Sequence, residues 1–164
     1  MTASSTPEPT EHASGPFAFR RGHIGRALAR AFWLFEDQIA AGIHAHGFPD
    51  YRHADGQVLR HLPVDGGARV VELAERAGMT KQGMAKLVGG MEARGYLERR
   101  PDPDDGRAQR VLMTPRGRAL MLAAGRAMAD LEAQWADVVG SERLDDIKAA
   151  LLNIADALGP ADHL

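Results

Sequence analysis

The sequence predicts a mainly α-helical protein with a small β-wing: a winged helix-turn-helix lobe joined to a region of long helices. Three observations carry this prediction. Through most of the chain, apolar residues recur every three or four positions, which is the spacing of amphipathic helices. Two such segments flank a short turn at Gly78, as in a helix-turn-helix. Two short strand segments follow directly, separated by the turn-rich residues 101–107, and predict the wing.

The composition limits the classes of protein that are possible. The 164 residues suffice for one domain of usual size or two small ones. Apolar residues make up 45% of the chain and charged residues 26%, which excludes a collagen-like or wholly disordered protein. Cysteine is absent, so disulfides, thiolate zinc sites and iron–sulfur clusters are excluded. Because no membrane-spanning run or secretory signal is visible either, we expect a cytoplasmic protein.

The first 50 residues predict a tail and a long helix. Residues 1–16 are rich in Ser, Thr, Pro, Glu and Ala, and we expect a disordered N-terminal tail. Residues 17–50 are expected to form the first long helix and the break after it, since Gly47-Phe48-Pro49-Asp50 is a strong turn signal. One face of this helix is apolar and carries Ile24, Leu28, Phe32, Phe35, Ile39 and Ile43.

Residues 51–113 contain the predicted winged helix-turn-helix. A short helix comes first, and it is expected to face inward with Val58, Leu59 and Leu62. The two main helices have apolar residues at i, i+3, i+4 and i+7: Val70, Leu73, Ala74 and Ala77 in the first, and Met84, Leu87, Val88 and Met91 in the second. The Thr80 hydroxyl is expected to cap the second helix. The wing strands are expected at residues 97–100 and 108–113.

Residues 114–164 predict two further helices. Thr114-Pro115 is a helix start, and the helix that it begins extends to about Val139, a length of about 40 Å. In the last helix, apolar residues from Leu144 to Leu158 alternate between spacings of three and four, as in packed helices. The long apolar stripes of residues 17–50 and 114–164 need a partner surface, and a second copy of the chain is the simplest partner. We therefore expect both segments to form a dimerisation region.

The formal net charge of −2 conceals an uneven distribution. Residues 51–118 contain thirteen Lys and Arg against nine Asp and Glu, a net charge of +4, so the rest of the chain carries −6. A basic middle between acidic arms indicates an anionic partner for the middle alone. Chance segregation of solvated charges is the alternative interpretation.

Three sequence runs resemble those of a known family. They are VELAERAGMTKQ at residues 71–82, LERRPDPDDGR at residues 97–107 and LMTPRG at residues 112–117. In this order and spacing they resemble the MarR (multiple antibiotic resistance regulator) family of bacterial winged-helix transcription factors. The resemblance extends over about residues 32–158 and implies a homodimer that interlocks through its first, fifth and sixth helices. It also implies a repressor-type regulator that binds double-stranded DNA at a pseudo-palindromic operator and is released by a small ligand, often an aromatic one.

The candidate DNA contacts lie on the second main helix and on the wing. A recognition helix enters the major groove, where Gln82 and Lys86 suit base edges, and Thr80 and Lys81 suit phosphates. Arg107 at the wing tip suits the minor groove, and Asp105 is expected to orient it by a forked hydrogen bond. The remaining candidates contact phosphate or pair with wing acids: Arg99, Arg100 and Arg110. The alternative is that these residues form a solvated surface, with Thr80 serving only as a cap.

The chain departs from the family at several candidate contacts. Gly83 replaces a bulkier polar residue of many relatives, Gly89-Gly90 replaces an Asp-Arg pair, and Gly106 replaces a first wing arginine. Each helical glycine costs about 1 kcal/mol relative to alanine. The departures predict a modest operator affinity, or recognition that depends on the wing and on DNA shape. They also leave open a winged-helix module that serves protein assembly without specific DNA binding.

Other kinds of chemistry have weaker support in the sequence. His44, His46 and His53 lie near Asp50 and could bind zinc in a metal-sensing regulator, although polar residues near a helix end are the simpler interpretation. Candidate walls of an aromatic-ligand pocket are Trp33, Tyr51 and Trp135, with core or interface packing as the alternative. No nucleophile elbow, phosphate loop or H-E-x-x-H motif is present, so we expect a protein that is not an enzyme and needs no cofactor.

Overall fold

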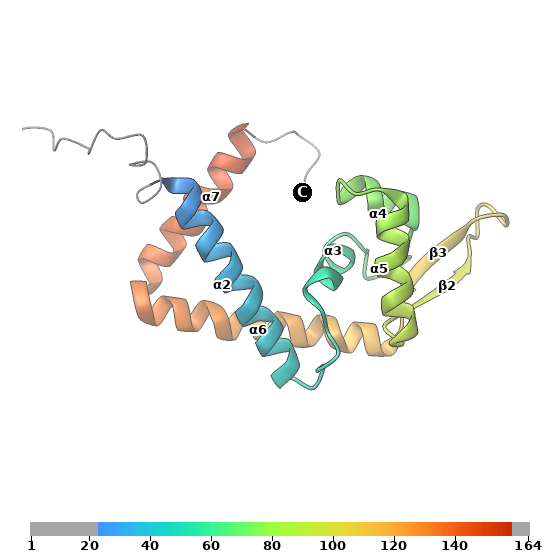
Figure 1. Ribbon diagram of the computed structural model, residues 1–164, viewed down its shortest axis with the longest axis horizontal. Coiled ribbons are helices and arrows are strands. Elements are labelled where there is room, and N and C mark those ends of the chain that lie inside the picture. Colours follow the sequence, from blue (N-terminus) through green and yellow to red (C-terminus); the bar gives the residue numbers. More distant parts are fainter. Residues whose placement is uncertain (1–22, 159–164) are drawn as a thin grey trace, which may run out of the picture. The chain divides into compact units, whose positions relative to one another are not determined.

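The computed structural model describes residues 23–158 (Figure 1). The chain divides after Phe35 into two units, so that residues 23–35 belong to one and residues 36–158 to the other. The predicted tail at residues 1–16 and the predicted helix start at residue 17 lie outside the described residues. Of the helices described, none has the length and apolar character that crossing a membrane requires.

The first described helix, α2 (Ile24–Ala45), ends where the sequence predicts a break. Gly47 follows with a φ of +97°, a left-handed conformation that glycine adopts without strain. A single 3₁₀ turn, η1 (His53–Asp55), and the short helix α3 (Gly56–Leu59) come next. The predicted inward-facing residues of this segment are buried, as expected: Val58, Leu59 and Leu62.

The helix-turn-helix consists of α4 (Val70–Arg76) and α5 (Lys81–Ala93). Gly78 between them has a φ of +59°, which allows the tight turn. The Thr80 side-chain oxygen accepts a hydrogen bond from the backbone N–H of Gly83 at 3.1 Å. The predicted N-cap of α5 is therefore confirmed.

A three-stranded antiparallel sheet forms the wing, in the order β1-β3-β2. The two strands predicted from the sequence, β2 (Leu97–Pro101) and β3 (Gln109–Met113), agree with the prediction to within one residue. The third strand, β1 (Ala68–Arg69), is not predicted from the sequence, and Ala68 pairs with Val111 of β3. Gly67 precedes β1 with a φ of +61°, and a Cβ there would lie 2.2 Å from the Val111 carbonyl oxygen. Only glycine permits this close approach of β1 to β3.

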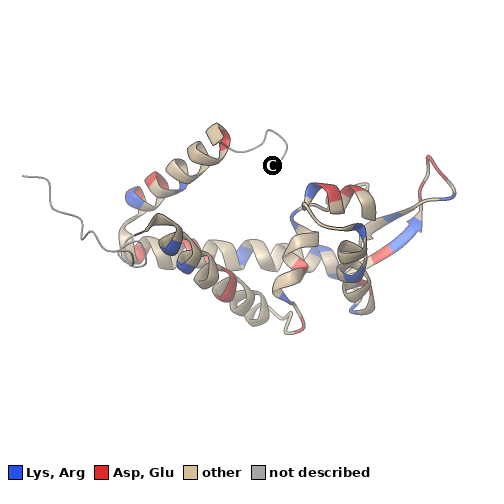
Figure 2. Cartoon of the chain, turned by 45° about the horizontal axis from the view of Figure 1, so that its top comes forward, with Lys and Arg blue, Asp and Glu red and all other residues tan. Residues whose placement is uncertain are grey.

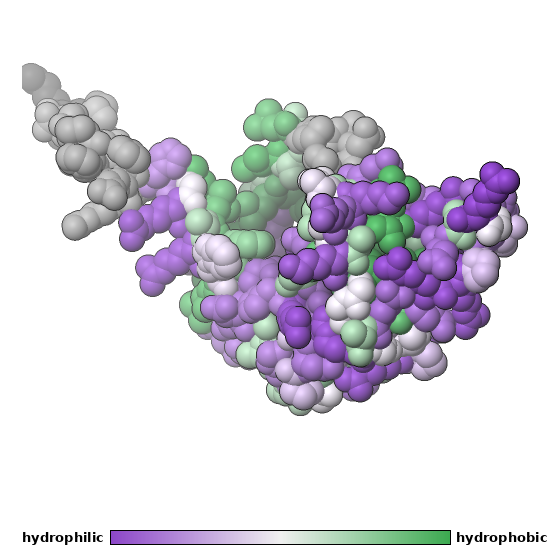
Figure 3. All heavy atoms as spheres, turned by 45° about the vertical axis from the view of Figure 1, so that its right-hand side comes forward, coloured by the Kyte–Doolittle hydropathy of each residue, from purple (hydrophilic) through white to green (hydrophobic). Residues whose placement is uncertain are grey.

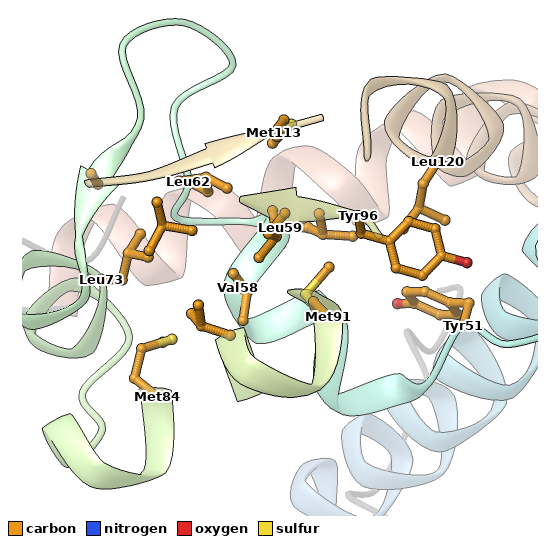
Figure 4. Packing of buried hydrophobic residues seen from close by; sticks show 14 of the residues in the cluster. Tyr51, Val58, Leu59, Leu62, Leu73, Met84, Met91, Tyr96, Met113 and Leu120 are labelled. Atoms are coloured by element: carbon orange, nitrogen blue, oxygen red, sulfur yellow. The ribbon is translucent and has the colours of Figure 1, made fainter. Parts of the chain in front are cut away.

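The core of the 36–158 unit collects side chains from every element around the sheet (Figure 4). Helices α4 and α5 contribute the predicted apolar residues, with Leu73, Met84, Val88 and Met91 inaccessible to solvent. Tyr96, at the entry to β2, is also inaccessible, and in Figure 4 its ring lies at the end of the cluster that holds Tyr51 and Leu120. This shared core makes the helix-turn-helix and the wing one packed lobe.

Two further helices follow, α6 (Pro115–Val139) and α7 (Ser141–Leu158), and Gly140 separates them. Thr114 caps the start of α6, because its hydroxyl oxygen accepts a hydrogen bond from the Gly117 N–H at 3.1 Å. The spacing of apolar residues predicts a buried stripe along this helix, made up of Leu120, Met121, Ala124, Met128, Leu131, Trp135 and Val138. This prediction is only partly right. Leu120 and Leu131 are buried, but Met128 and Val138 are exposed, and the buried face contains Ala123 and Ala127 instead. Small residues lie there because α2 approaches closely: a Cβ on Gly42 would come within 2.7 Å of the Ala127 Cβ.

Candidate nucleic-acid interface

The outward face of α5 carries polar side chains in its N-terminal half. Met84, Val88 and Met91 are buried, which turns the opposite side of the helix to solvent. Lys81, Gln82 and Lys86 lie exposed on that side. Within residues 23–158, no hydrogen bond or ion pair engages these three side chains. They are therefore free to meet an external partner.

The one acid of α5 and the arginine that follows the helix are both paired within the lobe. The carboxylate of Glu92 accepts from Nε of Arg99 on β2 at 3.0 Å. Arg94, just after the helix, pairs with the buried Asp55 at 2.7 Å. The charge that α5 presents outward therefore comes from Lys81 and Lys86, and it is positive. Figure 2 shows that Lys and Arg alternate with Asp and Glu along the elements of this lobe.

The wing tip exposes Arg107. The Asp105 carboxylate accepts a hydrogen bond from the backbone N–H of Arg107 at 3.1 Å, and this bond fixes the backbone of the wing tip. The expected forked bond from Asp105 to the guanidinium is not what the structure shows. The second carboxylate oxygen of Asp105 instead lies 3.7 Å from Nη2 of Arg69. Asp105 thus shapes the turn and leaves the guanidinium of Arg107 free to extend outward.

The base of the wing is organised around Asp102, which is buried. Its carboxylate accepts from Nε of Arg69 at 2.7 Å and from the backbone N–H of Asp104 at 2.9 Å. The hydrogen bond from Arg69 is the main reason that the pKa of Asp102 lies below its ordinary value. Arg110 places its buried Nε 3.8 Å from the same carboxylate, too far for a hydrogen bond. Sequence reasoning missed Arg69, because its strand was not predicted.

The other two wing arginines pair with nearby acids. Arg99 pairs with Glu92 of α5, as described above, and Arg100 pairs with Glu98 at 2.6 Å. Both are exposed residues. The Thr80 hydroxyl is occupied as an acceptor in the cap, but the residue is exposed as well. The structure thus places the predicted contacts of α5 and of the wing on the surface of one lobe, with Arg110 half-buried at the wing base.

The aromatic candidates for a ligand pocket have packing partners. Tyr51 is buried, and burial raises its pKa to about 12. The indole N–H of Trp135 donates to the side-chain oxygen of Gln38 at 2.9 Å. Trp33, in the 23–35 unit, packs edge-on against Phe32 with ring centroids 6.0 Å apart. A role of these residues in ligand binding stays a prediction.

The three histidines do not converge. Nε2 of His44 lies 3.0 Å from the Tyr51 carbonyl oxygen, and Nε2 of His46 lies 3.2 Å from the Asp130 carboxylate. His53 faces the carboxylates of α2, Glu36 and Asp37, at 3.7 and 3.8 Å. In the part of the chain that the structure describes, no group of three or more metal-ligating side chains is gathered. The zinc-binding interpretation gains no support from this geometry.

Residues 52–108, from the loop before α3 to the wing tip, match the family model described as "MarR family". The transcriptional regulator HosA of Escherichia coli O111:H- is 34% identical over 79 residues. The aligned segment is 48% of this chain, and it spans 58% of HosA. The family-model match contains α3, the helix-turn-helix and β2, and it ends just before β3. Over this segment the chain is similar to the MarR family.

Solved MarR-type structures have the same fold. The transcriptional repressor CouR, bound to a 23-mer DNA duplex, is 23% identical with a TM-score of 0.67, covering 87% of this chain and 99% of CouR. PcaV from Streptomyces coelicolor, in complex with its natural ligand, is 22% identical with a TM-score of 0.61, covering 88% of this chain and 98% of PcaV. The predicted fold class is confirmed. The family and these relatives are transcription regulators, which agrees with the prediction of a protein that is not an enzyme.

Proposed function

We propose that this chain is a MarR-family DNA-binding transcription repressor, which binds a pseudo-palindromic operator as a homodimer and is released by a small aromatic ligand. The observation that carries the proposal is the outward face of α5. It presents Lys81, Gln82 and Lys86, which have no partner in residues 23–158, while the only acid of that helix, Glu92, is neutralised by Arg99. A helix with such a face fits the major groove of B-DNA.

The proposed DNA contacts divide into base readers and phosphate contacts. Gln82 and Lys86 lie one turn apart on α5 and are assigned to base edges, with Thr80 and Lys81 at the helix start on phosphates. Arg107 is assigned to the minor groove, where a lone guanidinium meets the deepest negative potential. Phosphate contacts are assigned to the remaining wing residues: Arg99, Arg100 and Arg110. Asp105 supports Arg107 through the backbone.

The proposed dimer uses the apolar side chains outside the lobe, in residues 17–50 and 114–164, with residues 51–113 as the DNA-binding domain. In α7 the predicted seam residues after Leu144 are exposed: Ile147, Leu151, Ile154 and Leu158. The described start of α2 exposes Ile24, Leu28, Phe32, Trp33 and Leu34. Figure 3 shows hydrophobic surface interrupting a largely hydrophilic face. Apolar surface of this extent is characteristic of a protein interface, and a second copy satisfies it symmetrically.

The proposed release by a ligand rests on similarity to relatives. PcaV is described with a natural ligand, and CouR from Rhodococcus jostii RHA1 is described bound to p-coumaroyl-CoA. In this chain the candidate aromatic contacts are Trp33, Tyr51 and Trp135. A thermal-shift screen of aromatic acids, followed by competition against bound DNA, tests this part of the proposal.

Selection of bound duplexes from a random DNA pool tests the main proposal. Fluorescence anisotropy on the recovered duplex should show a sequence-specific excess of affinity and a steep loss of affinity with salt, because phosphate contacts release counterions. Arg107→Ala should weaken binding at least about tenfold. Arg126→Ala, an exposed arginine of α6 outside the lobe, is the matched control and should have little effect. A monomer in sedimentation, or binding without sequence preference, contradicts the proposal and favours an assembly module.

A further inference from the structure

Three elements meet at a polar cluster beside Tyr96. Tyr96 is inaccessible to solvent, and its hydroxyl donates to the carboxylate of Asp50 in the loop after α2. Nη2 of Arg116, in the first turn of α6, donates to the two Asp50 oxygens at 3.2 and 3.1 Å. The Arg116 guanidinium also covers the Tyr96 ring, 4.8 Å from its centroid, which is a cation–π contact. We call Asp50, Tyr96 and Arg116 the junction triad.

Backbone contacts join α6 directly to the same place. The Thr114 N–H donates to the Tyr96 carbonyl oxygen at 3.0 Å, and the Thr114 hydroxyl donates to the Gly95 carbonyl oxygen at 2.7 Å. A Cβ on Gly117 would come within 2.1 Å of the Tyr96 carbonyl oxygen, so the first turn of α6 lies directly on residues 95–96. Residues 95–96 connect α5 to β2. The start of α6 is therefore fixed to the two elements that are proposed to face DNA, α5 and the wing.

Arg94 connects the triad to the end of the candidate recognition helix. It is the residue that follows α5, and its Nη1 donates to the Asp50 carbonyl oxygen at 2.6 Å. The same guanidinium forms a two-pronged pair with the buried Asp55, with both distances at 2.7 Å. The loop after α2, the end of α5 and the start of α6 thus share one network of charged hydrogen bonds. Such bonds are stronger and more directional than neutral ones.

Because α6 is long, a small rotation at this network has a large effect. Its 25 residues extend over about 37 Å, at about 1.5 Å per residue. A rotation of about 5° at one end moves the other end by about 3.2 Å, close to the rise of one base pair, about 3.4 Å. In a dimer joined through α6 and the neighbouring helices, a freer rotation of α6 at this network would change the distance between the two recognition helices.

We propose that the junction triad sets the spacing of the two half-sites that the dimer accepts. Asp50, Tyr96 and Arg116 are positioning residues: they act through the direction of α6 relative to α5 and the wing. The inference rests on the proposed DNA-binding dimer. It assigns the choice of operator spacing to residues that do not touch DNA.

Spacer variants of the operator test the proposal. The duplex recovered by selection is compared with the same duplex carrying one inserted or one deleted central base pair. The unmodified protein should lose roughly 100-fold in affinity for the altered duplexes, because the half-sites no longer match. Arg116→Gln and Tyr96→Phe should each reduce that loss to about tenfold or less. Arg118 is an exposed arginine two residues further along α6. Arg118→Gln removes the same charge, and this variant should still lose roughly 100-fold in affinity for the altered duplexes.

A purely structural role gives a different result. If the triad only stabilises the fold, Arg116→Gln lowers the Tm while the loss of affinity for spacer variants stays at the unmodified level. That outcome overturns the proposal. An equal change in Arg118→Gln also overturns it, because charge near the DNA would then explain the effect.

A second measurement needs no DNA. The chain has no cysteine, so Glu75→Cys on α4 and Gln134→Cys on α6 give two spin-label positions, both exposed. Labelled protein is diluted with unlabelled protein, and the distance within one chain is measured by pulsed electron paramagnetic resonance. Arg116→Gln should broaden the distance distribution, whereas Arg118→Gln should not. An unchanged distance distribution in Arg116→Gln overturns the inference even if the protein binds DNA. A broadened distribution in a protein that does not bind DNA refutes only the proposed function.

Discussion

Replacing Arg94 by Met should be among the most destabilising single changes in the lobe. Asp55 is 2% exposed, and both of its carboxylate oxygens accept from the Arg94 guanidinium. In Arg94→Met, Asp55 keeps the backbone N–H of Arg52 as its only hydrogen-bond donor among the described residues. A buried charge that loses its partner costs about 3–5 kcal/mol. The carbonyl oxygens of Asp50 and Gly90 also lose a donor, which adds to the cost.

Removing both charges should recover most of this loss. In the double variant Asp55→Leu with Arg94→Met, no buried carboxylate remains unpaired, and apolar replacements of buried ion pairs are often close to neutral. About 1–2 kcal/mol of destabilisation should remain from the carbonyl oxygens that Arg94 no longer caps. The coupling between the two positions in a double-mutant cycle should therefore be about 2 kcal/mol or more.

Urea unfolding at one fixed protein concentration measures these differences, since the stability of a dimer depends on concentration. Arg118→Met, an exposed position without a side-chain partner among the described residues, should stay within about 0.5 kcal/mol. A loss below about 1 kcal/mol in Arg94→Met would refute the reasoning from burial. So would a double variant that is as unstable as Arg94→Met alone.

Further predictions concern backbone and pH. Gly89→Ala should stabilise α5 by about 1 kcal/mol, since an added Cβ meets no atom within 4 Å. Gly117→Ala should be strongly destabilising in the same urea assay, because its Cβ would collide with the Tyr96 carbonyl oxygen. The pKa values of Asp50 and Asp102 are lowered from 3.8, chiefly by the Tyr96 hydroxyl and by Arg69 respectively. The stability from these carboxylates is complete above the unfolded pKa and lost as the pH falls through the lowered folded values. Asp102→Asn should make acid unfolding less steep.

Much of the fold could be predicted because its determinants are local. The apolar spacing of α4 and α5 lies within single helical turns, and the caps Thr80 and Thr114 act on residues three positions away. The wing strands are marked by the turn-rich segment between them. Strand β1 has only two residues and exists through its pairing with β3, some forty residues later, so no local pattern reveals it.

The candidate site was predictable in part for the same reason. The outward face of α5 follows from its buried face, which places Lys81, Gln82 and Lys86 without further information. The partners of the arginines do not follow from spacing. Arg69 meets Asp102 across 33 positions, and Arg116 meets Asp50 across 66. Only the packing of the lobe brings such residues together.

These pairings change what the net charge of +4 over residues 51–118 means. Arg69, Arg94 and Arg116 face carboxylates, and they contribute more to positioning the lobe than to its outward field. The field on the proposed DNA face comes instead from Lys81, Lys86 and Arg107, all exposed. The two groups should therefore respond differently to substitution. Loss of an outward charge should reduce the salt slope of DNA binding by about one and leave the free energy of unfolding nearly unchanged. Loss of Arg69, Arg94 or Arg116 should lower stability and leave the salt slope in place.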